Sequence, residues 1–190
     1  MISANVLAAA AAAVILQAPA ALAAPLPWTV DKAGSSLRFA SSLGGEAFSG
    51  IFRRWDADIR FDPADLTHSS VTVTVDVASA ATGNADRDQA LPTADFFAAA
   101  KFPRATYQAT TFKMVSPGHY QATGVLSMRG VSKPLILPFT LVIAGPAARM
   151  SAQAAINRLA FGVGQNEWTA TTTLPAAVQL TIAVNARRVK

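Results

Sequence analysis

The sequence is poor in the residue types that most often carry chemistry. Its 190 residues include no cysteine and two histidines, and 14% of them are charged. The absence of thiols excludes disulfides, thiolate metal ligands and lipid attachment at a cysteine. The two histidines, His68 and His119, lie in separate loop and turn segments, so no spacing predicts a zinc triad. We therefore predict neither a bound metal nor a cofactor.

Catalytic motifs are equally scarce. The chain has no Gly-x-Ser-x-Gly elbow, and Gly162-Val163-Gly164 lacks the strand–helix context of a phosphate-binding loop. The carboxylates Asp56, Asp58 and Asp62 are interpreted as solvated charges, with a Ca²⁺ site as the alternative. Composition leaves a Ser–His–Asp arrangement open. We predict a protein that is not an enzyme.

No hydrophobic run is long enough to span a bilayer. The longest, Val6–Leu16, has 11 residues, and a transmembrane helix needs roughly 20. The first charged residue is Asp31, and Ala21-Leu22-Ala23 places small residues before a cleavage point. We predict a signal peptide over residues 1–23, followed by a single periplasmic domain over residues 24–190 that does not span the membrane. An uncleaved anchor is the alternative, because the first residues carry no Lys or Arg.

Positive charge is in excess. The formal net charge is +5, and Arg187, Arg188 and Lys190 cluster at the C-terminus. This charge favours solubility or attraction to anionic lipid head groups. No basic stripe is interleaved with aromatic residues, so we predict no nucleic-acid partner.

What the sequence does have is alternation of apolar and polar residues with a period of two. Turn signals such as Pro117-Gly118 and Arg129-Gly130 separate the alternating segments. About eight strands, each with one apolar face, predict a closed antiparallel barrel or a sandwich. Pro138 lies inside one of these segments and predicts an edge, a bulge or a ladder break there. The predicted strands are 36–40, 48–55, 71–77, 106–115, 120–128, 135–143, 150–156 and 178–184.

Residues 84–100 interrupt the strand pattern. Asn84 is expected to cap a short turn through Asp86–Leu91, and Thr93 to cap a second helical piece that contains Phe96 and Phe97. Such a helical insertion between two strands would plug one mouth of a barrel or shape its interior.

Several ordered motifs resemble the YceI-like family of small secreted lipid-binding β-barrels. The central block is the most specific, and the likeness extends over essentially the whole chain after residue 24. The motifs are Trp28-Thr29-Val30-Asp31, Phe48-Ser49-Gly50-Ile51-Phe52, Ile59-Arg60-Phe61-Asp62-Pro63, Thr82-Gly83, Arg87-Asp88, Asp95-Phe96-Phe97, Phe102-Pro103, Arg129-Gly130-Val131 and Phe161-Gly162-Val163-Gly164. Some relatives carry His-Leu-Gly where this chain has Ser42-Leu43-Gly44, so a role for that histidine does not carry over.

The resemblance implies a lipocalin-like antiparallel barrel of about eight strands with an elongated apolar cavity. It also implies non-catalytic binding, transport or sequestration of a polyisoprenoid lipid, either an isoprenoid quinone or a prenyl phosphate. Some relatives occur beside or fused to b-type membrane cytochromes, which makes such a cytochrome a possible partner. Two alternatives stay open: an interaction module for that cytochrome, and a hydrolase acting on a lipid-like substrate.

Candidate site residues follow from the inward-reading faces and the insertion. The predicted cavity lining is Phe39, Phe52, Phe96, Phe97, Leu126 and Met128, with plain core as the alternative for each. Arg38 and Arg87 are the predicted head-group contacts, since Arg suits phosphate through bidentate donors. For Arg87, a local ion pair with Asp86 or Asp88 is the competing interpretation.

Overall fold

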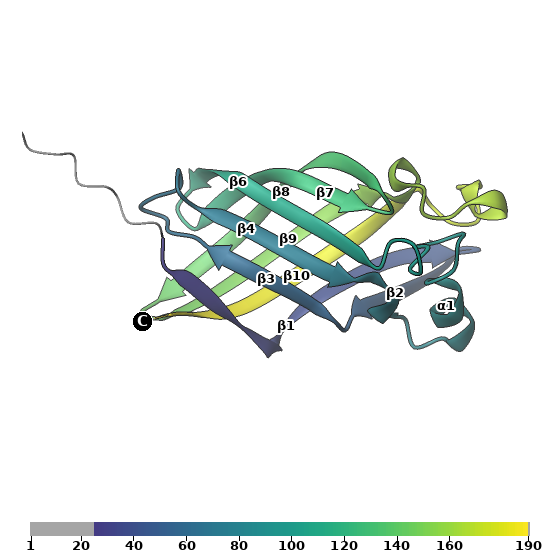
Figure 1. The fold of residues 1–190 in the computed structure, drawn as a ribbon, viewed down its shortest axis with the longest axis horizontal. Helices are drawn as coiled ribbons and strands as arrows, with labels where there is room; N and C mark the ends of the chain where they lie inside the picture. The colour runs from purple at the N-terminus through teal and green to yellow at the C-terminus, as the bar shows by residue number, and fades with distance from the viewer. Residues whose placement is uncertain (1–24, 190) are drawn as a thin grey trace, which may run out of the picture.

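A computed structural model describes residues 25–189, so the predicted signal peptide and Lys190 lie outside the described residues. One sheet of ten strands dominates this part of the chain (Figure 1). The strands are β1 (Pro27–Leu43), β2 (Glu46–Phe52), β3 (Trp55–Arg60), β4 (Ser70–Asp76), β5 (Ala80–Ala81), β6 (Arg104–Ser116), β7 (His119–Met128), β8 (Val131–Ala144), β9 (Ala147–Asn157) and β10 (Ala177–Arg188). The helical pieces are η1 (Val77–Ser79), α1 (Ala85–Ala90), η2 (Arg158–Phe161) and η3 (Asn166–Thr169). None of the helices among residues 25–189 has both the length and the apolar character needed to cross a membrane.

Pairing of the first strand with the last closes the sheet into a barrel. The strand order is β10-β9-β8-β7-β6-β4-β3-β1-β2-β5, and β1 also pairs with β10. Every neighbouring pair is antiparallel, from Trp28 opposite Arg188 to Ala40 opposite Gln179 in the closing ladder. Because β2 and β3 both pair with β1 and follow each other as one strand, and β5 has only two residues, the prediction of a closed antiparallel barrel of about eight strands is confirmed.

β1 is longer than predicted because it carries a bulge. The register against β10 shifts between Asp31 and Ser36, and the carboxylate of Asp31 accepts hydrogen bonds from the N–H groups of Ala33 (3.1 Å) and Gly34 (3.2 Å). Opposite the bulge, the strand predicted over residues 48–55 ends as β2 at Phe52, and β3, from Trp55 to Arg60, is absent from the predicted strands. Both β2 and β3 pair with β1, so they act as one bent strand.

Two predictions are confirmed at β8: the turn before it, at Arg129-Gly130, and a disruption of its strand pattern at Pro138. The hairpin between β7 and β8 turns at Arg129 (φ 52°) and Gly130 (φ 75°), two positive φ values in succession, as in the type I′ turns that suit hairpins. The strand pairs with β7 along its length, but its ladder with β9 begins only at Phe139. Of the edge, bulge or ladder break predicted at Pro138, the structure shows a ladder break, and it falls between β8 and β9.

The insertion between β4 and β6 covers one end of the barrel (Figure 1). The side chain of Asn84 accepts from the N–H of Arg87 at 3.0 Å and caps α1, as predicted. The second predicted helix is wrong: residues after Thr93 form successive turns. The hydroxyl of Thr93 donates to the carbonyl of Ala90 (2.7 Å) instead of capping, and Ala98 adopts φ 47°, which a helix does not allow.

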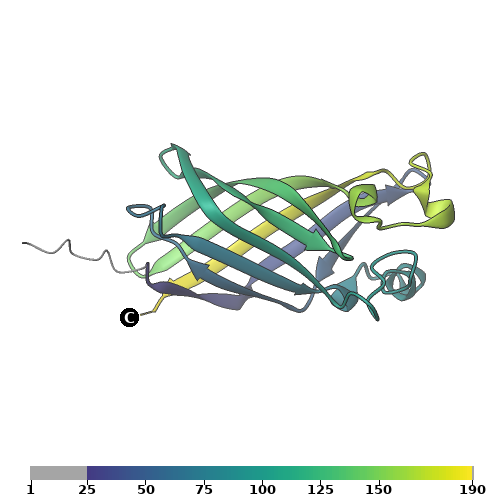
Figure 2. The ribbon, with the colours of Figure 1, turned by 45° about the horizontal axis from the view of Figure 1, so that its top comes forward.

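The same end is covered by the connection between β9 and β10, and the two loops are joined (Figure 2). The carbonyl of Asp95 accepts from the N–H groups of Gly164 (2.8 Å) and Gln165 (2.9 Å), and its carboxylate accepts from Asn166 (2.8 Å). The rings of Phe96 and Trp168 pack with centroids 5.4 Å apart. We call these joined loops, residues 77–103 and 158–176, the cap.

Asp88 holds the start of the insertion and generates a pH-dependent prediction. Its carboxylate accepts from the hydroxyl (2.7 Å) and N–H (2.6 Å) of Thr82, and these bonds hold the pKa of Asp88 below its ordinary value of 3.8. A carboxyl with a lowered folded-state pKa stabilises above the unfolded pKa, and the contribution is lost as pH falls through the folded pKa. Asp88→Asn should therefore be less stable than the wild type at pH 7, and the difference should shrink below about pH 3.8.

Urea denaturation of both proteins at several pH values measures this difference. Asp86→Asn removes the same charge from an exposed position of α1 and is the matched control. A stability gap for Asp88→Asn that stays constant from pH 7 to strongly acidic pH would show that the bonds to Thr82 do not depend on the charge.

Candidate functional site: an apolar cavity

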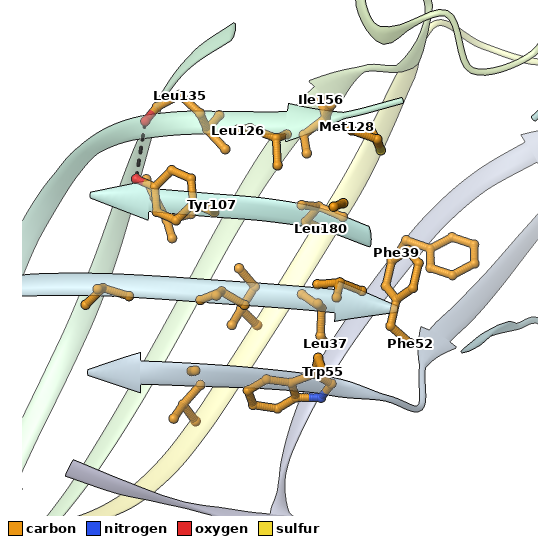
Figure 3. Close-up of a pocket in the computed structure, with 18 of the residues that line it drawn as sticks. Leu37, Phe39, Phe52, Trp55, Tyr107, Leu126, Met128, Leu135, Ile156 and Leu180 are labelled. Atoms are coloured by element: carbon orange, nitrogen blue, oxygen red, sulfur yellow. Dashed lines mark hydrogen bonds between the residues drawn. The ribbon is translucent and has the colours of Figure 1, made fainter. Parts of the chain in front are cut away.

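The barrel encloses a cavity of about 280 Å³, and its lining is almost entirely apolar (Figure 3). An apolar cavity of about 150 Å³ already stays dry and accepts a benzene-sized guest. Every strand except β5 contributes to the wall, together with the cap. Larger lining residues include Leu37, Phe39, Phe48, Phe52, Trp55, Val73, Phe96, Phe97, Tyr107, Leu126, Met128, Leu135, Ile156 and Leu180.

Small residues at inward positions create this space. Ala57, Ala105, Ala122 and Ala148 line the cavity at positions where larger side chains would fill it. Two glycines seat aromatic rings against the wall. A Cβ on Gly50 would lie 2.3 Å from the ring of Phe39, and one on Gly124 would lie 2.9 Å from the ring of Tyr107. These rings therefore lie flat over backbone and leave the centre open.

Aromatic side chains close the end of the barrel opposite the cap. Phe61 contacts the rings of Phe112, Tyr120 and Phe139, with centroids 5.2, 5.5 and 5.9 Å away. The indole of Trp28 donates to the carbonyl of Phe61 at 2.8 Å. Trp28, Phe61 and Tyr120 are buried. We call this group the aromatic plug.

The six predicted lining residues all border the cavity. Phe39 of β1, Phe52 of β2 and Phe97 of the cap form a chain of rings with successive centroids 5.1 and 6.0 Å apart. Leu126 and Met128 come from β7 and lie near Ile156 of β9 (Figure 3). Phe96 reaches the same space from the cap. Their contact with a ligand stays a prediction.

The two predicted head-group cations occupy different positions. Arg87 forms no ion pair with a carboxylate in residues 25–189, so the local pairing with Asp86 or Asp88 is not found. Its guanidinium lies 4.9 Å from the ring centre of Phe48, a lining residue. Arg38 is exposed on the outer face of β1, between the inward-facing Leu37 and Phe39.

Three lining residues carry polar groups of particular interest. The hydroxyl of Tyr107 donates to the carbonyls of Ala122 (3.1 Å) and Leu135 (3.3 Å), and burial raises the pKa of Tyr107 to about 12. It therefore stays protonated over the physiological range. The hydroxyl of Ser41 is buried and has no hydrogen-bond partner among residues 25–189. Ser41 lies opposite Phe48 in the β1–β2 ladder, so it is on the side of the cavity where Arg87 packs.

Arg158 is the third lining residue with a polar side chain, and this residue is only 3% exposed. Its five N–H donors bond to five carbonyls, those of Pro175, Val163, Gly164, Trp168 and Leu174, at 2.6–3.5 Å. Burial holds its pKa below the ordinary value. No donor is left over for a ligand, so Arg158 organises the loop between β9 and β10.

Sequence reasoning missed Arg158 and Ser41 as interior residues. Both were detectable from the alternation: Arg158 continues the inward series Ala152, Ala154, Ile156, and Ser41 continues Leu37 and Phe39. The predicted strand 36–40 ended one residue too early to include Ser41. The histidines lie outside the lining: His68 bonds to Asp65 at 2.8 Å, and His119 begins β7.

A closed antiparallel barrel with an apolar interior and a looped cap defines a lipocalin-like class of protein. Residues 28–186 match the YceI-like domain, and the chain belongs to this family. A UPF0312 protein of Vibrio cholerae is 33% identical over 121 residues, which are 62% of this chain and 64% of that protein. One from Pseudomonas savastanoi pv. phaseolicola is 33% identical over 129 residues, 66% of each chain. The match thus spans less than two thirds of these relatives' length.

Solved structures show the same architecture. Burkholderia cenocepacia BcnA superposes with a TM-score of 0.79 at 28% identity, covering 82% of this chain and 98% of that one. The Campylobacter jejuni YCEI protein gives 0.68 at 30% identity, covering 74% and 85%. A polyisoprenoid binding domain from Saccharophagus degradans gives 0.70 at 14% identity, covering 86% and 99%, and this likeness concerns the fold alone.

The bonding of Arg158 predicts a large stability effect. Arg158→Met leaves five carbonyls without their donor and should lower the free energy of unfolding by on the order of 3 kcal/mol. Arg149→Met, on the exposed face of β9, the strand that precedes Arg158, should change it by less than about 0.5 kcal/mol. Urea unfolding followed by circular dichroism compares the two. Equal effects would show that the loop does not depend on Arg158.

Proposed function

We propose that this protein is a non-catalytic, periplasmic binder of a polyisoprenoid lipid, which it carries or sequesters with the apolar tail inside the barrel. The apolar cavity enclosed by the closed barrel is the observation that carries the proposal. Burial of a hydrocarbon tail there gains about 25 cal/mol per Å² of apolar surface removed from water, before the cost of ordering. The resemblance of the fold to a domain named for polyisoprenoid binding supports the same ligand class.

The lining supports binding rather than catalysis. Among the described residues, the cavity wall includes no carboxylate and no imidazole. General acid–base catalysis needs a group that exchanges protons near the working pH. The pKa of Tyr107, raised to about 12, keeps its hydroxyl protonated there. The one guanidinium in this wall, that of Arg158, has all five donors engaged.

The polar head is proposed to lie on the side of the cavity formed by β1, β2 and α1. Ser41 offers an unpartnered buried hydroxyl there, which can donate to a carbonyl or ether oxygen. Arg87 lies just beyond it, across the ring of Phe48, and remains the proposed contact for an anionic or strongly polar head. Arg38 is no longer proposed, because its side chain is exposed on the outside of the wall. A neutral isoprenoid quinone fits a single hydroxyl donor better than a fully desolvated phosphate, which needs paired cations.

Filling the cavity tests the binding proposal. Leu180→Trp places an indole into the space, whereas Thr181→Trp places the same group on the outer face of β10. Native mass spectrometry of the exported wild-type protein should show a bound species of prenyl-lipid mass, which Leu180→Trp loses and Thr181→Trp retains. Overpacking costs about 1–3 kcal/mol, so Met128→Gln, of similar volume, serves as a second cavity variant. A wild-type protein that is empty and also ignores added isoprenoid quinone would contradict the proposal and favour an interaction module.

Ser41 yields a prediction in which binding and stability move in opposite directions. Ser41→Ala removes a buried hydroxyl that has no partner, so thermal stability should stay equal or rise. Binding of an isoprenoid quinone should weaken about three- to tenfold, because the head loses one hydrogen bond. Ser42→Ala, at the next position of β1, is the control and should leave binding unchanged. Fluorescence titration measures the affinities, and equal affinity of Ser41→Ala and wild type would remove Ser41 from the site.

A further inference from the structure

The wall of the barrel contains a seam between β8 and β9. The β8–β9 ladder runs from Ala144 opposite Ala147 to Phe139 opposite Ala152 and stops there. Beyond it, residues 131–138 of β8 pair only with β7, and residues 153–157 of β9 pair only with β10. Where the ladder is intact, the hydroxyls of Thr140 and Ser151 also bond across it at 2.6 Å. No side-chain hydrogen bond in the described chain joins the two strands along the seam.

Prolines account for the position of the seam. Pro134 and Pro138 have the same parity on β8, so the two missing N–H donors point toward the same neighbouring strand. The ladder with β7 passes both prolines without a register shift, opposite Val125 and Gln121. The ladder with β9 is the one that is absent. The sequence of β8 thus keeps one edge unpaired along this stretch.

The seam opens onto the cavity. Leu135 and Leu137 of β8 and Ile156 of β9 all line the cavity, and they lie on the unpaired stretches of the two strands. Leu135 and Ile156 are labelled in Figure 3. On the outer face, the side chain of Ile136 is 57% exposed and that of Val125, on β7 opposite Pro134, is 44% exposed. Apolar surface therefore continues from the outside of the barrel to its interior across this seam.

Other routes into the cavity are closed more firmly. The aromatic plug fills one end, and the cap covers the other through the bonds of Asp95 with Gly164 and Gln165. The wall has a second discontinuity beside the bulge of β1, where pairing with β3 ends at Trp28. There the ammonium group of Lys32 spans the gap: it donates to the carbonyl of Trp55 and pairs with Asp56 at 2.9 Å.

We propose that the β8–β9 seam is the entrance through which an apolar lipid chain passes sideways through the barrel wall into the cavity. Tyr107, on the inner side of the wall, holds β8 in the closed position of this entrance. The hydroxyl of Tyr107 reaches the carbonyl of Leu135 at 3.3 Å, which ties the unpaired strand to the interior (Figure 3). A lateral entrance lets the whole molecule settle along the barrel axis without threading through the cap or the plug. This inference rests on the proposed function and adds the route by which the ligand enters.

Cross-linking tests the entrance. Because the wild-type chain has no cysteine, only the introduced thiols react with the cross-linker. Ile136→Cys with Ala155→Cys places thiols on the outer face on either side of the seam, where a reducible bis-maleimide can bridge them. Val142→Cys with Arg149→Cys, a register pair in the intact part of the same ladder, is the matched control. Two further pairs lock the alternative routes: Asp95→Cys with Asn166→Cys in the cap, and Lys32→Cys with Asp56→Cys at the bulge.

The probe is a ubiquinone with a geranyl tail, and its uptake is followed by stopped-flow quenching of tryptophan fluorescence, since Trp28 and Trp55 line the cavity. We expect the seam cross-link to slow uptake by about tenfold or more, as for other gating steps, and reduction of the linker to restore it. The three other cross-links should leave the rate unchanged. Tyr107→Phe, which loses the hydrogen bonds to the carbonyls of Leu135 and Ala122, should take up and release the probe faster than wild type.

The outcomes separate the entrance from the proposed function. If the wild type quenches normally and the seam cross-link does not change the rate, the entrance is overturned while the binding function stands. If the cap or bulge cross-link blocks uptake instead, the entrance lies there. If the unmodified wild-type protein shows no uptake of the probe, the proposed function fails, and the entrance fails with it.

Discussion

The structure depends on closure of a sheet around side chains that are too small to fill it. β1 must pair with β10 for the barrel to close, and that pairing removes the two long edges that an open sheet would expose. Closure also fixes the diameter of the barrel, whereas the inward side chains decide how much of the interior stays empty. Alanines at inward positions of β3, β6, β7 and β9 leave the space that larger residues would occupy. The cavity therefore results from small inward side chains in a barrel whose diameter is fixed by backbone hydrogen bonds.

Polar groups in this interior fall into two kinds, and the difference separates structure from function. Arg158 has every donor satisfied by main-chain carbonyls, so its charge serves to order a loop that would otherwise have unpaired carbonyls. Tyr107 likewise has carbonyl partners on two strands. Ser41 alone among these three has none. A buried hydroxyl without a partner is unfavourable in the empty protein, and this makes Ser41 a natural position for a ligand's polar head.

The wall itself is not uniform, and its irregularities have separate physical origins. The bulge of β1 is held by Asp31 and bridged by Lys32, so extra residues are accommodated without opening the barrel. The seam between β8 and β9 has no such bridge, because prolines remove donors and no side chain replaces them. Since strands pull apart most easily where ladder bonds are missing, the seam is the part of the wall least resistant to opening.

Sequence patterns were sufficient to predict the class of fold, the order of most strands, the N-capping of α1 by Asn84 and a disruption of the strand pattern at Pro138, because alternation, N-capping and proline act locally. They also placed Phe39, Phe52 and Met128 on inward faces, since parity along a strand is readable from residue type. That the barrel is hollow could be established only from the three-dimensional structure, because alternation is the same for a filled and an empty interior. Three further features also required the three-dimensional structure: the hydrogen bonds of Arg158, the absence of a partner for the Ser41 hydroxyl, and the missing β9 pairing along part of β8. Each of them depends on segments that are distant in the chain. The turns after Thr93 were mispredicted for the same reason: contacts between the cap loops outweighed local helix propensity.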